Sequence, residues 1–229
     1  MSRKIAFTSL GCDKNRVDSE VMLGILQQNG YTAVADAAEA DIIVVNTCCF
    51  IKDALEESIE TILEMSKYKN PEVGHCKGLI VAGCLGQRYE KEFFDELPEV
   101  DAIVGTTAYE SIAEVADEIL GGKEQVKQLE SIDLAMQDGN GKLRVLSTAP
   151  YFAYLKISEG CDNRCTYCVI PQMRGRHRSR ELESLVEEAT LLAQQGVKEL
   201  VIVAQDTSIY GRDLYGKPML DALLRRLNA

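Results

Sequence analysis

The chain has 229 residues, a formal net charge of −11 and 46% hydrophobic content, which is ordinary for a packed protein. The acidic balance disfavours a general nucleic-acid surface, because phosphate binding depends on Lys and Arg. No apolar run approaches the roughly 20 residues of a membrane-spanning helix, and no signal peptide precedes the first strand-like stretch, so we expect a cytosolic protein without a membrane partner.

Short runs rich in Val and Ile alternate with helical patterns over residues 1–121, which favours βα units and a parallel sheet. The pattern predicts strands at 4–10, 41–46, 78–82 and 102–104. Helices are expected at 15–29, from about 54, from 87 to near 98, and at 109–120. Gly30 is a typical stop for the first helix, and Asp53 and Glu56 have capping-box spacing at the start of the second.

From 122 to 150 the pattern fades into charged sequence with a strong turn signal at 138–141, and we assign this segment to a linker. A new series then begins, with strands at 151–157 and 199–204 and helices at 181–195 and 218–227. We therefore predict an α/β protein. An open parallel-sheet domain occupies 1–121, and 151–229 holds the first units of an incomplete βα barrel, because two strands cannot close one.

Eight cysteines without a secretory signal favour metal or redox chemistry over disulfides. Cys161, Cys165 and Cys168 lie in a loop directly after a predicted strand, separated by three and then two residues. Three thiolates can hold three irons of a [4Fe-4S] cluster and leave the fourth iron open to a cofactor. A structural zinc site completed by His177 remains the alternative.

A second set of cysteines follows three predicted strands. Cys12, Cys48 and Cys84 each lie just after a strand end, and in a parallel sheet these ends share one edge. We predict that the three thiols converge there as metal ligands. The alternative is three separate buried cysteines that act as small apolar residues. Cys49 and Cys76 are predicted not to be ligands.

The cysteine loop, with Tyr167 directly before its last cysteine, resembles the radical S-adenosylmethionine enzymes. The resemblance implies that the open iron chelates S-adenosylmethionine and that one electron cleaves this cofactor to a 5'-deoxyadenosyl radical. Tyr167 would pack against the adenine. Gln205 and Asp206, at the end of the second barrel strand, are further candidate cofactor contacts. An ordinary structural role remains open for all three residues.

The two cysteine sets together resemble the methylthiotransferase family, which joins a three-cysteine domain to a radical S-adenosylmethionine barrel. Segments 9–20, 170–175 and 204–211 resemble its RimO branch. The resemblance covers the whole chain but only the N-terminal part of the family protein. It implies two [4Fe-4S] clusters, a low-potential flavodoxin-like or ferredoxin-like electron donor, and transfer of a methylthio group to the β-carbon of an aspartate in a small-subunit ribosomal protein.

Some features depart from the resemblance or leave alternatives. Asp13 and Glu181 stand where the branch commonly has proline, and the family continues beyond Ala229, which puts activity of this fragment alone in doubt. Six basic residues stand against two acidic ones between Lys156 and Arg180. The basic stretch from Arg174 to Arg180 could face S-adenosylmethionine, the substrate or an electron donor, and a solvated charged face is the default interpretation. A transfer-RNA adenosine methylthiotransferase and a zinc or redox-sensing module remain alternative functions. Iron with acid-labile sulfide would separate the enzymes from the module.

Overall fold

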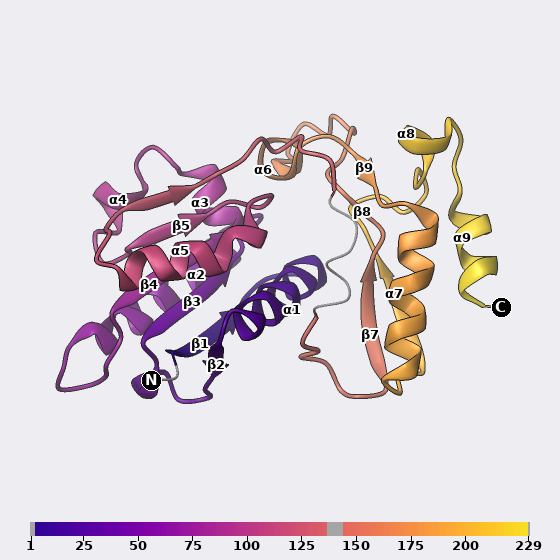
Figure 1. Ribbon diagram of the computed structural model, residues 1–229. Coiled ribbons are helices and arrows are strands. Elements are labelled where there is room, and N and C mark those ends of the chain that lie inside the picture. Colours follow the sequence, from indigo (N-terminus) through magenta and orange to yellow (C-terminus); the bar gives the residue numbers. More distant parts are fainter. Residues whose placement is uncertain (1–2, 137–143, 229) are drawn as a thin grey trace. The chain divides into compact units, whose positions relative to one another are not determined.

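The computed structural model describes residues 3–136 and 144–228, and the predicted turn at 138–141 lies outside them. The chain forms two compact units, residues 1–131 and 132–229, which are described separately. Figure 1 labels most of their helices and strands.

Within the described residues, the first unit is built on a six-stranded parallel sheet with the order β2-β1-β3-β4-β5-β6. Every residue of its central strands β3 and β4 is buried, as expected for parallel strands that are covered on both faces. The strands are β1 (Arg3–Ser9), β2 (Tyr31–Ala33), β3 (Ile42–Thr47), β4 (Gly78–Gly83), β5 (Ala102–Val104) and β6 (Val126–Gln128).

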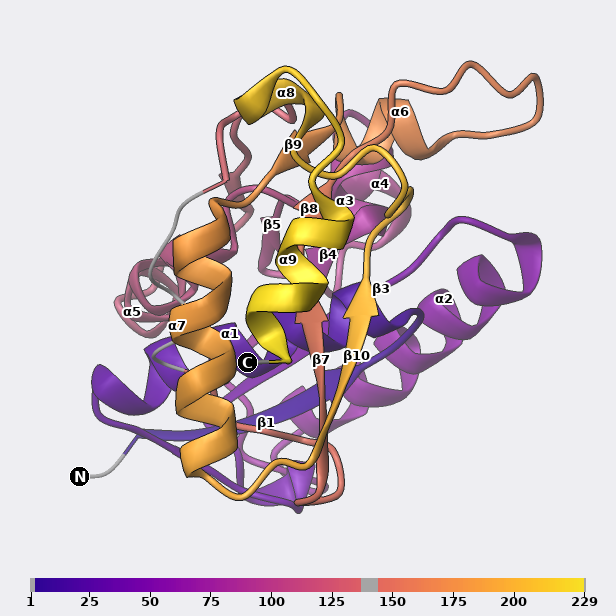
Figure 2. The ribbon, with the colours of Figure 1, turned by 90° about the vertical axis from the view of Figure 1, so that its right-hand side faces the viewer.

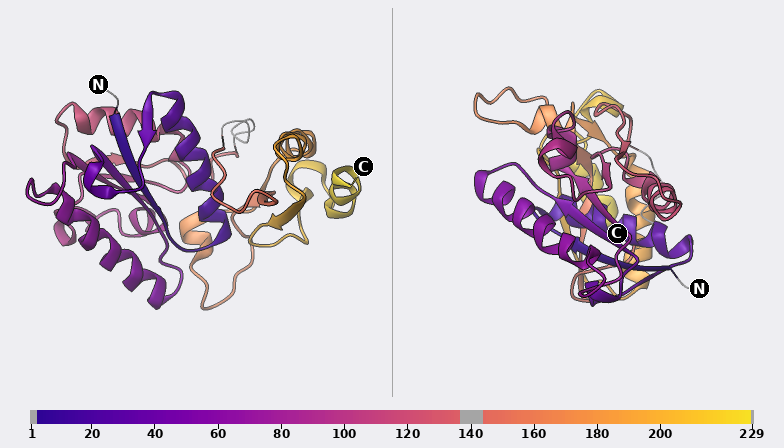
Figure 3. Two further views of the ribbon diagram at one scale, coloured as in Figure 1. Left: turned by 90° about the horizontal axis from the view of Figure 1, so that it is seen from below. Right: turned by 90° about the vertical axis from the view of Figure 1, so that its left-hand side faces the viewer.

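Helices cover this sheet on both sides. α1 (Asp13–Gln28) and α5 (Ile112–Leu120) pack on one face through a buried cluster that includes Met22, Leu26 and Ile112. α2 (Lys52–Ser66) lies on the side opposite α5 (Figure 3), and α3 (Cys84–Arg88) follows β4 directly. The remaining short helices are η1 (Ala37–Glu39), η2 (Lys67–Lys69), α4 (Phe93–Glu96) and η3 (Tyr109–Ser111).

The second unit begins a βα series. β7 (Phe152–Lys156) and β10 (Glu199–Val203) pair in parallel, and α7 (Leu182–Gln194) and α9 (Leu220–Leu227) pack beside them (Figure 2). Leu155, Leu185 and Leu223 are fully buried in the shared core. The smaller described elements are β8 (Ser158–Glu159), paired antiparallel with β9 (Arg178–Ser179), and helices α6 (Ile170–Arg174) and α8 (Arg212–Tyr215). The predicted α/β fold with the first units of a barrel is confirmed.

Two local predictions about helix starts are wrong. A single helix from Gln87 to near Pro98 was expected, but α3 begins at Cys84 and ends at Arg88, and α4 is separate. Gly83 has a φ of +90°, and this turn lets the helix start directly after the strand. Asp53 does not cap α2, because the N-cap residue is Ile51 and no side chain caps the helix.

The segment 122–150, which we assigned to a linker, contains strand β6. This strand pairs with β5 at the sheet edge, and its sequence Val-Lys-Gln carries no clear strand signal. The division between the two units falls between Ser131 and Ile132, also inside this segment. The limits of 1–121 and 151–229 that we predicted for the two domains remain a prediction.

A buried ion triad braces the second unit. Glu188 on α7 is 3% exposed, and its carboxylate accepts hydrogen bonds from Arg144 at 2.5 Å and from Arg180 at 2.6 Å. The two guanidinium groups also donate to the backbone oxygens of Tyr154 and Lys156 on β7. Burial alone would raise the pKa of Glu188, but the charges of Arg180 and Arg144 outweigh it and hold that pKa below its ordinary value.

Replacement of Glu188 by alanine should lower the free energy of unfolding by about 3–5 kcal/mol at pH 7, because two buried guanidinium groups would lose their counter-charge. Since the folded-state pKa is lowered, this contribution is present above the unfolded value of about 4.3 and is lost as the pH falls through the folded value. Urea unfolding of Glu188→Ala beside the exposed neighbour Glu187→Ala measures it. Equal midpoints for both variants would contradict the bracing role.

Candidate metal centres and cofactor site

The first set of cysteines lies at one edge of the sheet in the first unit. Cys12 precedes α1, Cys48 follows β3, and Cys84 is the first residue of α3 after β4. Because β1, β3 and β4 are parallel neighbours, their carboxyl ends meet at the same edge. Cys12 is exposed, whereas Cys48 and Cys84 are buried.

Glycines before two of these cysteines let the loops approach each other closely. A Cβ at Gly11 would lie 2.4 Å from Cys48 Cβ and 3.1 Å from Cys48 Sγ, so the Cys12 loop packs directly on Cys48. A Cβ at Gly83 would lie 2.4 Å from Asn46 Oδ1. Both glycines have positive φ, at +85° and +90°, which favours glycine on conformational grounds as well. The structure therefore brings the predicted cysteine loops together.

Cys49 and Cys76, which are predicted not to be ligands, are both buried. Burial raises the pKa of Cys49 to about 12, and the neighbouring Cys84 thiol acts in the same direction. The guanidinium of Arg88 lowers this pKa but does not outweigh the burial. Burial also raises the pKa of Cys76, whose thiol donates to Gly78 O at 3.2 Å. Cys76 precedes β4 and so lies at the end of that strand away from Cys84. It is not at the edge where the three cysteine loops meet.

The second set of cysteines lines one cavity in the second unit. Cys161, Cys165 and Cys168 border a space of about 720 Å³, together with loop residues that include Asp162 and Asn163. Cys161 is buried, Cys168 is half-buried and Cys165 is exposed. All three cysteines of the loop therefore border a single open space, although their exposure differs.

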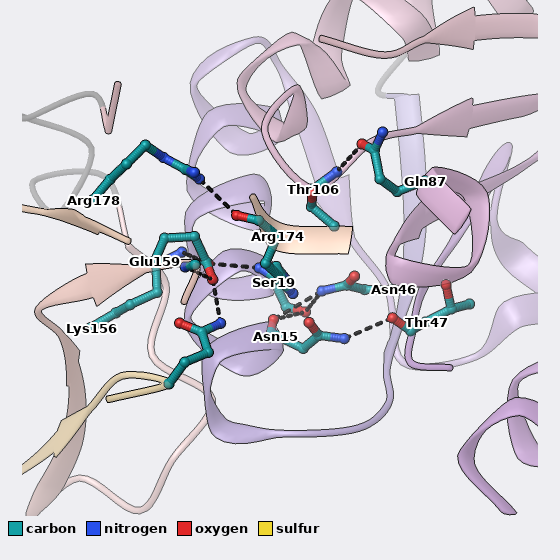
Figure 4. Close-up of polar contacts among 12 residues, drawn as sticks. Asn15, Ser19, Asn46, Thr47, Gln87, Thr106, Lys156, Glu159, Arg174 and Arg178 are labelled. Atoms are coloured by element: carbon teal, nitrogen blue, oxygen red, sulfur yellow. Dashed lines mark hydrogen bonds and ion pairs between the residues drawn. The ribbon is translucent and has the colours of Figure 1, made fainter. Parts of the chain in front are cut away.

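Glu159 closes the base of this loop, and Figure 4 shows it between Lys156 and Arg174. Its Oε1 accepts hydrogen bonds from the backbone N–H of Gly160 at 3.1 Å and from the amide of Gln205 at 2.5 Å. Its Oε2 accepts from Arg174 at 2.8 Å and pairs with the Lys156 ammonium at 3.4 Å. Glu159 is 4% exposed. One buried carboxylate thus joins the residue before the loop, the helix after it and the end of β10.

The backbone tightens the same closure. The N–H of Cys161 donates to Gly175 O at 3.1 Å, across the neck of the loop. Gly160 has a φ of +76°, and a Cβ there would lie 1.9 Å from Arg176 O. From the sequence, Glu159 is counted only as one of the two acidic residues between Lys156 and Arg180. Its place directly before a Gly-Cys pair at a strand end was the signal that could have identified it.

Two of the predicted cofactor contacts lie beside this loop. Gln205 is half-buried, and its Oε1 has no hydrogen-bond partner among the described residues while its nitrogen is held by Glu159. Asp206 accepts from Asn163 of the cavity wall at 3.3 Å. The Ser208 hydroxyl, Ser208 N–H and Asn163 amide outweigh burial and lower the pKa of Asp206, so it is ionised at neutral pH.

Two other residues stand apart from the cavity lining. Tyr167 is 84% exposed, so its ring is not packed against the described protein. His177, the fourth ligand in the zinc alternative, is buried with its ring Nε2 3.0 Å from Ser179 Oγ. In the described part of the chain, no three His, Cys, Asp or Glu side chains are already grouped to hold a metal ion.

The sequence matches two known families. "Uncharacterized protein family UPF0004" matches residues 4–105, and "Radical SAM superfamily" matches residues 155–227. Two similar curated proteins are each named ribosomal protein uS12 methylthiotransferase RimO. The one from Lachnoclostridium phytofermentans is 56% identical over 99% of this chain, and the one from Acetivibrio thermocellus is 51% identical over all of it. The chain spans about half the length of these relatives, at 50% and 51%.

A solved structure shares the fold. The radical S-adenosylmethionine methyltransferase TsrM from Kitasatospora setae, with tryptophan and a cofactor analogue bound, has a TM-score of 0.64. The alignment covers 98% of this chain and 50% of that one, at 15% sequence identity. This similarity supports the architecture of the chain and not a common substrate.

Replacement of Gly11 by alanine should remove the iron bound at the first cysteine set, because the new Cβ would collide with Cys48. Gly30→Ala is the matched control, since Gly30 has nearly the same φ, +83°, but open space around its Cβ position. Both variants should pay about 1–2 kcal/mol of backbone strain. Only Gly11→Ala should lose about four irons per chain after anaerobic reconstitution. Full iron content in Gly11→Ala would contradict the close approach of these loops.

Proposed function

This chain belongs to the methylthiotransferase family of radical S-adenosylmethionine enzymes, and we propose that it carries the cluster sites of an enzyme that modifies ribosomal protein uS12. The reaction adds a methylthio group to the β-carbon of an aspartate in that protein. The observation that carries the proposal is the pairing of two three-cysteine sets, one on a shared sheet edge and one around a single cavity. The curated relatives bear the name of this activity.

Six cysteines would hold the two [4Fe-4S] clusters, with Cys12, Cys48 and Cys84 at the first and Cys161, Cys165 and Cys168 at the second. The donor set fits, because each set offers three thiols in one region of the fold. A single tetrahedral ion with bonds of about 2.3 Å holds its sulfur ligands about 4 Å apart, whereas a cubane gives each thiolate its own iron and spaces them more widely.

When bound, these clusters and S-adenosylmethionine would supply the radical and sulfur chemistry. The task of the chain is to hold and orient them. Glu159 fixes the amide nitrogen of Gln205 and leaves the amide oxygen as an acceptor for the amino group of the cofactor. Asp206 adds an ionised carboxylate beside the cavity. Tyr167, exposed before the last loop cysteine, would cover the adenine.

The partners follow from the proposed chemistry. Ribosomal protein uS12 would be the substrate, and a flavodoxin-like or ferredoxin-like protein would supply low-potential electrons. No helix among the described residues is long and apolar enough to span a membrane. Because the chain has a net charge of −11, we expect that it does not bind nucleic acid directly. We propose a cytoplasmic location.

Product analysis tests this function. The chain, extended to the length of its curated relatives, is reconstituted anaerobically and incubated with S-adenosylmethionine, a low-potential reductant and uS12. Mass spectrometry should show one aspartate in which a methylthio group replaces one hydrogen, and Cys12→Ala and Cys161→Ala should each abolish it. A protein with full iron content that modifies an adenosine of transfer RNA and leaves uS12 unchanged would contradict the proposal in favour of the transfer-RNA alternative.

A further inference from the structure

Buried polar side chains join the three loops that carry the first cysteine set. Asn15 on α1 is 0% exposed, and its amide donates to Leu10 O at 3.2 Å and to Thr47 O at 2.8 Å (Figure 4). Leu10 lies just before Gly11-Cys12, and Thr47 lies just before Cys48. One amide therefore links the backbones of the Cys12 and Cys48 loops.

Thr47, the last residue of β3, links this strand to the loop that carries Cys84. Its hydroxyl donates to Ala82 O at 2.7 Å and accepts from Leu85 N–H at 3.3 Å. Ala82 and Leu85 flank the Gly83-Cys84 pair on either side, and Thr47 is 0% exposed. A hydroxyl can donate and accept at once, so a single side chain bridges the backbone before and after Cys84.

Two further side chains, Asn46 and Ser58, fix the middle loop. The Asn46 amide donates to Asn15 O and to Ser19 Oγ, both at 2.9 Å. Ser58 on α2, also 0% exposed, accepts from Cys48 N–H at 3.2 Å and donates to Cys48 O at 2.8 Å. The backbone of Cys48 is thus held by a side chain from a different helix.

We propose that Thr47 is a positioning residue for the first cluster, and that its hydroxyl sets the spacing of the Cys48 and Cys84 loops before iron binds. The inference rests on the proposed function, because it assumes a cluster at Cys12, Cys48 and Cys84. Thr47 does not touch the cluster in this role. It acts through the backbone of Ala82 and Leu85, which the sequence places one residue beyond the Gly83-Cys84 pair on each side.

The chain offers a close test of the hydroxyl itself. Thr47→Val keeps the size and shape of the side chain but can neither donate nor accept, whereas Thr47→Ser keeps the hydroxyl. Both are made in a chain with Cys161, Cys165 and Cys168 all replaced by alanine, so that iron reports on the first cluster alone. The readouts are iron and sulfide per chain, the electron paramagnetic resonance spectrum of the reduced cluster, and the unfolding midpoint of the iron-free chain.

The background chain should bind about four irons. Thr47→Val should lose at least three-quarters of that iron or show a changed resonance spectrum, while Thr47→Ser should match the background in both. Iron-free Thr47→Ser should unfold like the background, whereas iron-free Thr47→Val should still unfold cooperatively but at a lower midpoint, because two buried hydrogen bonds are lost. If Thr47→Val does not fold, Ser58→Ala takes its place, and it should lose iron in the same assay because the Cys48 backbone is released.

Two results would overturn the inference and can be told apart. About four irons with an unchanged spectrum in the folded variant would show that the hydroxyl does not position the ligands, and would leave the proposed function intact. No iron in the background chain would remove the first cluster itself, and the proposed function would fail with it.

Discussion

The parallel register of β1, β3 and β4 is the constraint on which the first site depends. Ser9 pairs with Asn46, and Thr47 pairs with Gly83, so the residues before the cysteine loops stand level across three strands. A slip of one residue would turn each side chain to the other face of the sheet and separate the thiols. The buried central strands oppose such a slip, because every apolar side chain of β3 and β4 would have to be repacked.

The polar network then converts this register into a defined site. A buried donor or acceptor that loses its partner costs about 1–3 kcal/mol, so Asn15 and Thr47 are strongly held to the loop backbones that they contact. The second cysteine set is held in place by contacts between residues that are close in the sequence. There, both ends of the cysteine loop meet at the carboxylate of Glu159, within sixteen positions of the chain from 159 to 174.

The sequence predicts much of this arrangement, because the informative signals are local. Short apolar runs, several of them rich in Val and Ile, located β1, β3, β4, β5, β7 and β10, and the position of a cysteine after three of those runs predicted the shared edge. The edge strands β2 and β6 have three residues each and too little apolar pattern to stand out. The roles of Thr47 and Glu159 depend on partners that only the folded chain brings near, such as Ala82 and Gln205. No periodicity or spacing rule reveals these partners, although the position of Glu159 directly before the Gly160-Cys161 pair marks that residue in the sequence.

Iron and acid-labile sulfide, quantified anaerobically after reconstitution, test most directly whether the two cysteine sets are separate cluster sites. The parent chain is compared with Cys12→Ala and Cys161→Ala. Two cubane clusters predict about eight irons in the parent and a loss of about four in each variant. Iron near zero with stoichiometric zinc in the parent would contradict the radical-enzyme assignment, and a loss confined to Cys161→Ala would contradict the site on the sheet edge.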